Sequence, residues 1–207
     1  MAIHPATAPT SAANERYTID SVTSKDGTVI SYRQLGHGDG IVLLHGSMES
    51  AASHMGLANA LADAFTVYLP ERRGHMENVN RSTYSMQREV EDLDALLRKT
   101  DTHNVFGVSA GGIIALQAAL DLPAIRKVAV YEPALIVNHS LSTDFLPRYD
   151  REIADGKIAA ALISGMLGGK LGPAFFSLLP RFLMESMTSK MLKQEDATAK
   201  PGDFTMR

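Results

Sequence analysis

The sequence predicts an α/β fold, in which a mostly parallel, doubly wound sheet carries helices on both faces and is followed by a helical cap region. Short apolar runs, typical of buried strands, alternate with longer segments whose apolar residues recur at helical spacing. An Asp-Gly pair near the start of the pattern indicates a β-hairpin. Further along, a glycine-rich turn joins one strand directly to a helix. Together these features favour a hairpin followed by repeated strand–helix units.

The first elements are a hairpin and a buried strand. Strand-like runs at 17–22 and 28–35 flank the tight turn Asp26-Gly27. The continuous apolar run 41–44 predicts a parallel strand that is buried on both faces.

Two strand–helix units follow. Helical periodicity covers 50–64, and a short strand at 65–69 leads into a polar loop at 71–83. Apolar residues at helical spacing then predict a helix over 86–97, with Ser85 as its N-cap.

The glycine-rich turn lies in the next unit. An apolar strand at 105–108 turns through 109–112 into a helix that reaches Leu120, and a further strand is predicted at 127–131. In open sheets of this kind, ligands bind beyond the carboxyl ends of the strands. Residues that directly follow these strands are therefore expected to converge on one site.

The residue pattern changes after Ala134, where apolar clusters alternate with Gly and Pro. Short helices are predicted near 144–154, 157–167 and 173–192. Three methionines, Met184, Met187 and Met191, fall at helical spacing. They are interpreted either as helix core or as part of a flexible lid over an apolar pocket. The expected domain organisation comprises a disordered leader, a core, a helical cap or lid and a flexible tail: 1–16, 17–134, 135–193 and 194–207.

Composition excludes several classes of function. The chain has 207 residues, of which 45% are hydrophobic and 21% charged, and a net charge of −3 argues against nucleic acid as a partner. There are no cysteines, so disulfides and thiolate metal sites are excluded. We expect a soluble, cytoplasmic protein with no secretory signal, no membrane span, no metal and no cofactor.

The most informative motif is G-x-S-x-G, which spans Gly107 to Gly111 around Ser109. A serine on a sharp strand-to-helix turn is strained, and its hydroxyl is pushed out above the sheet. Small residues are needed two positions before and after it because strand and helix nearly touch there. The free N–H groups of the helix that follows favour negative charge near the hydroxyl. The pattern therefore predicts a nucleophile elbow, although a Gly-rich structural turn gives a similar sequence.

Four segments resemble the α/β-hydrolase fold superfamily: IVLLHGS at 41–47, RRGH at 72–75, VFGVSAGG at 105–112 and KVAVYEP at 127–133. The resemblance implies acyl chemistry through a covalent ester on Ser109. It also implies an oxyanion hole formed by the backbone N–H groups of Ser47 and Ala110.

The resemblance leaves the roles of nearby polar residues open. His45 is expected to anchor its turn rather than to act as a base. Arg72 and Arg73 are expected to form ion pairs that fix their loop, with a substrate carboxylate as the alternative partner.

The acid and base of the expected triad are not obvious. In one interpretation, Glu132 and His139 complete a compressed Ser-acid-His arrangement. In the other, the chain is a shortened member without the usual downstream acid and histidine, and Glu132 caps a helix or pairs with Arg72 or Arg73.

The leading hypothesis is a serine hydrolase of esterase type that cleaves a small-molecule ester, lactone or related acyl substrate. The alternative is a non-catalytic or truncated protein of the same fold that binds a small apolar ligand or a partner in the same crevice. If no strand follows 127–131 in the sheet, its edge stays open, and we then expect poor solubility or a homodimer formed through that edge.

Overall fold

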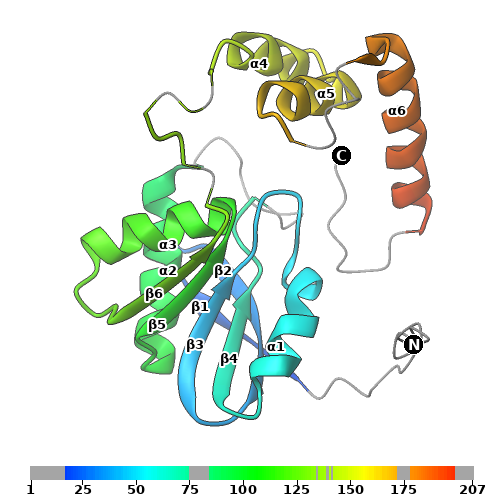
Figure 1. The fold of residues 1–207 in the computed structure, drawn as a ribbon. Helices are drawn as coiled ribbons and strands as arrows, with labels where there is room; N and C mark the ends of the chain where they lie inside the picture. The colour runs from blue at the N-terminus through cyan, green and yellow to red at the C-terminus, as the bar shows by residue number, and fades with distance from the viewer. Residues whose placement is uncertain are drawn as a thin grey trace, which may run out of the picture.

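A six-stranded sheet organises the protein. The computed structural model describes residues 17–74, 84–133, 135–138, 140, 142–171 and 178–198. Its strand order is β1-β2-β4-β3-β5-β6 (Figure 1). The strands are β1 (Thr18–Thr23), β2 (Val29–Gly36), β3 (Asp39–Leu44), β4 (Phe65–Pro70), β5 (Asn104–Val108) and β6 (Lys127–Tyr131).

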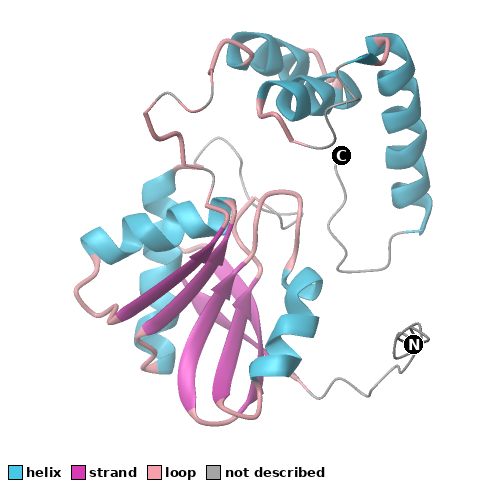
Figure 2. Ribbon diagram, viewed as in Figure 1, coloured by secondary structure: helices cyan, strands magenta, loops and turns pink. Residues whose placement is uncertain are grey.

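Helices cover both faces of this sheet and form a separate group after it. They are the 3-10 helix η1 (Ala51–His54), α1 (Met55–Leu61), α2 (Met86–Thr100), α3 (Ala110–Asp121), α4 (Leu146–Ala154), α5 (Ile158–Gly168) and α6 (Arg181–Thr198). Figure 2 shows α1 on one side of the sheet and α2 with α3 on the other. The predicted α/β class and doubly wound arrangement are confirmed.

The predicted hairpin is formed by β1 and β2. The two strands pair antiparallel from Thr18 opposite Gln34 to Thr23 opposite Val29. Gly27 has φ +88° in the turn between them, a conformation that glycine adopts at little cost. Strand β2 is also antiparallel to β4, so the hairpin forms one side of an otherwise parallel sheet.

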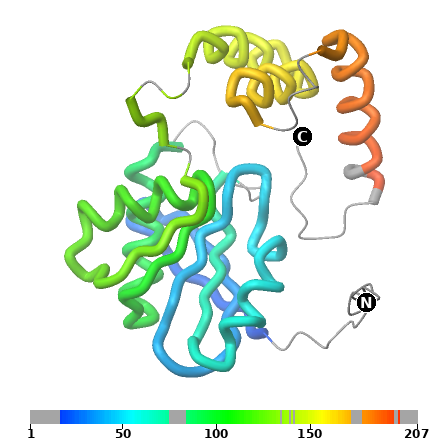
Figure 3. The backbone as a smooth tube through the Cα atoms, viewed as in Figure 1, coloured from blue at the N-terminus to red at the C-terminus, as the bar shows by residue number. Residues whose placement is uncertain are grey.

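Strands β4, β3, β5 and β6 are parallel neighbours, and their carboxyl ends lie at one edge of the sheet (Figure 3). Val42 and Leu44 of β3 pack with α2 and α3, whereas Leu43 packs with η1 and α1. All three side chains are buried, as the continuous apolar run predicts. The fold therefore rests on two apolar layers that hold the parallel strands between them.

The helix expected over 50–64 is split in two. The backbone of Ser50 donates to Ser53 Oγ at 3.1 Å, and a single 3-10 turn follows. His54 then leaves helical geometry, with φ −107° and ψ 11°, before α1 begins. Helical periodicity in the sequence does not reveal this offset because both pieces place their apolar residues on the same face.

The three last helices lie beyond the carboxyl ends of the strands in Figure 1. Arg181 of α6 joins them by donating to Glu152 Oε1 of α4 at 2.8 Å and to Ser164 Oγ of α5 at 2.9 Å. Met184 is buried, whereas Met187 and Met191 are 61% and 51% exposed. One methionine therefore belongs to a helix core and two face outward. Helix α6 also extends to Thr198, into the segment expected to be a flexible tail.

Strand β6 pairs with β5, and no described strand lies on its other side. A homodimer through this edge stays a prediction. Within the described residues, no helix has the length and apolar character needed to cross a bilayer.

Candidate active site

Ser109 lies on the turn between β5 and α3. Its backbone has φ 50° and ψ −115°, a strained conformation for a residue with a side chain. The turn is held from both sides, because the Ser109 amide donates to Tyr131 O at 3.0 Å and its carbonyl accepts from Gly112 N at 3.0 Å. The residue is half-buried, and its hydroxyl makes no hydrogen bond within the described chain. Ser109 is thus fixed by its backbone while its side chain stays available.

The neighbouring glycines allow this turn to form. A Cβ on Gly107 would lie 2.6 Å from the carbonyl carbon of Gly111 and 2.7 Å from Gly112 Cα. A Cβ on Gly111 would lie 2.6 Å from His45 O. Real Cβ atoms do not approach backbone so closely, so strand, helix and the end of β3 can meet only where side chains are absent. This contact explains the G-x-S-x-G spacing.

The turn after β3 faces the same serine. A Cβ built on Gly46 would lie 3.3 Å from Ser109 Cβ. Ser47 is exposed and Ala110 half-buried, and neither amide donates a hydrogen bond to another described residue. Met48 follows with φ 59°. The main chain next to Ser109 therefore contains two amides without a partner among the described residues.

The fold has many counterparts among solved structures. A sequence profile of the "Alpha/beta hydrolase family" matches residues 41–203, well over half of the chain. The chain belongs to the alpha/beta hydrolase family. Within this family it is similar to a solved alpha/beta hydrolase from Sphaerobacter thermophilus DSM 20745, with 31% identity, a TM-score of 0.68, and coverage of 90% of this chain and 75% of that one.

Curated relatives are matched over shorter stretches. The chain is 33% identical over 116 residues to the uncharacterized hydrolase YraK of Bacillus subtilis (strain 168), which covers 53% of this chain and 43% of YraK. It is 34% identical over 94 residues to the magnesium-chelatase 30 kDa subunit of Rhodobacter capsulatus, which covers 44% of this chain and 33% of that subunit. The chain thus spans less than half the length of these relatives.

An epoxide hydrolase from an endophytic Streptomyces is a structural neighbour of this hydrolase-family chain. The two are 25% identical, with a TM-score of 0.51 and coverage of 55% of this chain and 36% of that one.

His45 anchors the turn after β3, as expected. Its side chain is 1% exposed, and its Nε2 accepts from the Arg72 amide at 3.2 Å. Because Nε2 accepts, Nδ1 carries the proton and donates to Gly46 O at 2.9 Å. Both ring nitrogens are therefore occupied by backbone, and His45 is unsuited to be the base.

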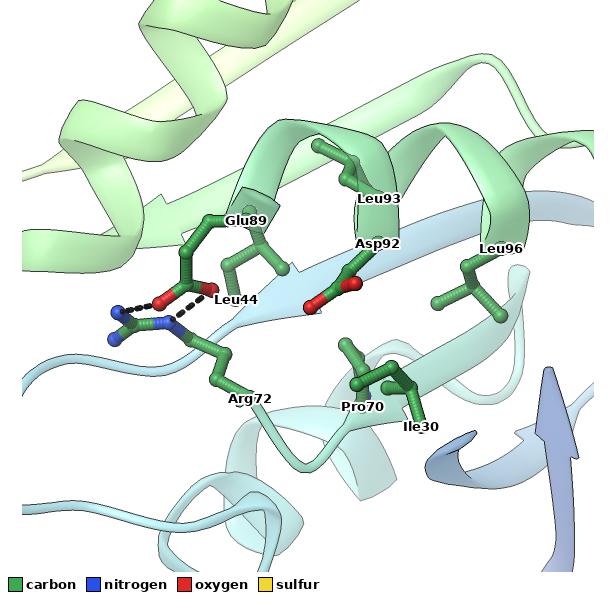
Figure 4. A pocket seen from close by; sticks show the side chains of 8 residues that line it. All are labelled: Ile30, Leu44, Pro70, Arg72, Glu89, Asp92, Leu93 and Leu96. Carbon is green, nitrogen blue, oxygen red and sulfur yellow. Dashed lines mark hydrogen bonds and ion pairs between the residues drawn. The ribbon is translucent and has the colours of Figure 1, made fainter. Parts of the chain in front are cut away.

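Arg72 and Arg73 form buried ion pairs with carboxylates of α2. Arg72 donates from Nη2 to Glu89 Oε1 at 2.7 Å (Figure 4). Its Nη1 donates to His45 O at 2.9 Å. Arg73 donates from Nε to Asp92 Oδ2 at 2.6 Å and from Nη1 to Asp26 Oδ2 at 2.9 Å. These partners confirm loop-fixing ion pairs.

The electrostatics of the arginine cluster follow from these bonds. The Asp92 carboxylate raises the pKa of Arg73, whereas the hydrogen bond from Arg73 lowers the pKa of Asp26. Burial raises the pKa of Asp92 itself, against the influence of Arg73. Carboxylates inside the protein balance the charges of both guanidinium groups, and no described ion pair joins Glu132 to Arg72 or Arg73.

Glu132 directly follows β6, at the same edge of the sheet as Ser109. Since Val108 pairs with Tyr131, Ser109 and Glu132 are the next residues on neighbouring strands. Glu132 is exposed, and its φ is 45°. His139 lies outside the described residues.

The structure adds two residues that sequence reasoning missed, Glu49 and His54. Glu49 Oε2 accepts from the Gly46 amide at 2.7 Å and contacts His54 Nε2 at 3.1 Å. Their only sequence signal is an acid and a histidine shortly after the His-Gly turn, which is too common to single out. Among the described residues, no cluster of three metal-binding side chains is found.

Proposed function

We propose that the protein is a serine hydrolase that cleaves a carboxylic ester, lactone or related acyl substrate through an acyl-enzyme on Ser109. The observation that carries the proposal is the strained backbone of Ser109 at the junction of β5 and α3. Family membership supports a hydrolytic reaction. The half-buried, unbonded hydroxyl supports a nucleophile rather than a structural serine.

The amides of Ser47 and Ala110 are the proposed oxyanion hole. The carbonyl oxygen of the substrate gains negative charge when Ser109 adds to it, and donors that are already in place stabilise that charge. Ala110 is the first residue of α3, so its N–H has no intrahelical acceptor and lies at the positive end of the helix. Removing one such donor typically costs about 3 kcal/mol of transition-state stabilisation.

A serine nucleophile favours acyl substrates over epoxides. Attack of a serine hydroxyl on an epoxide would form an ether, which water does not readily cleave. Attack on an ester forms another ester, and water hydrolyses it after the alcohol has left. The likeness to an epoxide hydrolase is therefore taken as a likeness of fold.

Helices α4, α5 and α6 are the proposed cap. They follow β6 in the chain and lie beyond the carboxyl ends of the strands (Figure 1). Exposed Met187 and Met191 supply adaptable apolar surface of the kind that suits a lid over an apolar acyl group. Glu132 remains the proposed triad acid because of its position beside Ser109, and His139 remains its proposed partner.

A fluorophosphonate probe tests the nucleophile directly. We expect the folded protein to be labelled at Ser109, as located by peptide mass spectrometry, and Ser109→Ala to remain unlabelled with an unchanged melting temperature. Hydrolysis of p-nitrophenyl esters should disappear in the same variant. A folded protein that neither reacts with the probe nor hydrolyses esters would refute the proposal and support a binding role for the crevice.

A further inference from the structure

One peptide plane joins the turn after β3 to the proposed oxyanion hole. The carbonyl of Gly46 and the amide of Ser47 belong to the same peptide, and no peptide bond among the described residues is cis. In a trans peptide the C=O and N–H groups point in opposite directions within one plane. Whatever holds Gly46 O therefore also sets the direction of the Ser47 N–H.

Two buried side chains hold Gly46 O. His45 donates to it from Nδ1 at 2.9 Å, and Arg72 donates from Nη1 at 3.1 Å. The same Nη1 donates to His45 O at 2.9 Å, so a single guanidinium nitrogen bonds two successive carbonyls of the turn. Hydrogen bonds are stronger in such low-dielectric surroundings than in water, so the peptide plane is held firmly.

Helix α2 aims the guanidinium at the turn. Glu89 of α2, itself buried, accepts from Arg72 Nη2 at 2.7 Å and from Arg72 Nε at 3.2 Å (Figure 4). Two parallel bonds of this kind fix the plane of a guanidinium group as well as its position. The third nitrogen, Nη1, is thus directed at the carbonyls of His45 and Gly46. The contacts run from α2 through Arg72 to the peptide that carries the Ser47 amide.

The held turn lies against the nucleophile. A Cβ on Gly46 would lie 3.3 Å from Ser109 Cβ, and the Gly46 amide donates to Glu49 Oε2 at 2.7 Å. Met48 has φ 59°, a conformation that persists only where the surroundings hold the backbone. Donors on Gly46 O also polarise the peptide and make its N–H a stronger donor. The direction and the strength of the Ser47 N–H therefore both depend on the contacts at Gly46 O.

We propose that Arg72 and His45 position the oxyanion hole by fixing the peptide between Gly46 and Ser47. The proposal rests on the proposed serine hydrolase function and names the residues that prepare one of its two oxyanion donors. Each acts through the backbone and is a positioning residue rather than a catalytic one. The negative charge on the substrate oxygen develops only in the transition state, so their loss should reduce turnover and leave substrate binding largely unchanged.

The double variant Arg72→Met/Glu89→Leu removes the guanidinium without leaving a buried charge unpaired. Removal of a whole oxyanion donor lowers kcat about 100- to 1,000-fold, and a misdirected donor should cost part of that. We therefore expect kcat for p-nitrophenyl ester hydrolysis to fall about 10- to 100-fold, with a small change in KM.

An aryl trifluoromethyl ketone supplies a second readout for this variant. The serine adds to the ketone carbonyl and leaves a negatively charged oxygen, as in the transition state of ester hydrolysis. The inhibition constant should rise by the factor by which kcat/KM falls. Loss of folded protein alone would lower the apparent kcat and leave this constant unchanged.

His45 provides an independent test. His45→Asn and His45→Phe both lose the acceptor for the Arg72 amide, but the Asn side chain retains an N–H donor near the position of Nδ1. The Asn variant should therefore have the higher kcat and bind the ketone more tightly. Equal inhibition constants for these two variants and wild type would overturn the proposal, even if the Arg72 double variant did not fold.

Arg73→Met/Asp92→Leu is the matched control. It removes a second buried ion pair between the same loop and α2, in which Arg73 bonds the carboxylates of Asp92 and Asp26. Its kcat and its inhibition constant should equal those of wild type.

Two results for folded Arg72→Met/Glu89→Leu would contradict the proposal. One is a kcat and an inhibition constant equal to those of the control, and the other is a lower kcat with an unchanged inhibition constant. In either case labelling of wild type at Ser109 would leave the hydrolase function standing. A wild type that neither labels nor hydrolyses esters would refute both.

Discussion

Replacing Arg73 with Met should strongly destabilise the protein. The Arg73 side chain is 1% exposed and that of Asp92 8% exposed, so the variant leaves a buried carboxylate without its cation. Breaking a buried ion pair from one side costs about 3–5 kcal/mol. For a chain of this length each kcal/mol lowers the melting temperature by about 2–4 °C. The expected decrease is therefore about 6–20 °C.

Thermal unfolding followed by circular dichroism measures this decrease, and Arg98→Met is the control. Arg98 is 76% exposed and bonds Asp94 at 2.9 Å on the surface of the same helix, so its loss should cost no more than about 0.5 kcal/mol. The double variant Arg73→Met/Asp92→Leu removes both charges and should regain most of the stability. If Arg73→Met had the same melting temperature as Arg98→Met, the reasoning would be refuted.

Two further predictions concern the elbow and acid stability. Gly107→Ala should unfold the elbow or abolish labelling of Ser109, because its Cβ would lie 2.6 Å from the Gly111 carbonyl carbon; Gly56→Ala, with nothing within 4 Å, should be labelled normally. Asp26 has a lowered pKa in the folded state, chiefly through its bond from Arg73, so its contribution is complete above about pH 4 and is lost as the pH falls further. Between neutral and acid pH, the free energy of unfolding measured by urea titration should therefore fall less for Asp26→Asn than for wild type. An equal fall in the two proteins would contradict this.

Local sequence patterns predict most of the fold because they reflect local constraints. The apolar run of β3 requires burial on both faces, and Asp26-Gly27 requires a tight turn; both hold in the structure. The elbow is predicted for the same reason. Backbone segments touch at Gly107 and Gly111, so only glycine fits at these two positions, and this requirement is visible in the sequence. The break at His54 escapes this reasoning, because a 3-10 turn preserves the apolar face.

Long-range partners could not be predicted in the same way. Arg73 bonds Asp26, which is 47 residues away, and Arg72 bonds Glu89, which is 17 residues away. The chain offers many acids, and only the packing of α2 on the sheet selects these. Between Gly46 and Glu49, which are hydrogen-bonded to each other, Met48 has φ 59°, a conformation that a methionine in the sequence does not predict.

Three of the six described non-glycine residues with positive φ lie where the chemistry is proposed. Met48, Ser109 and Glu132 all have positive φ, and each lies just beyond the carboxyl end of β3, β5 or β6. Such conformations cost on the order of 1–3 kcal/mol each and persist only when their surroundings hold them. Arg72 supplies part of that support, because its Nη1 donates to His45 O and Gly46 O while its other nitrogens bond Glu89. Helix α2 thereby holds the turn that faces Ser109, so the stability of the arginine cluster and the geometry of the site are physically linked.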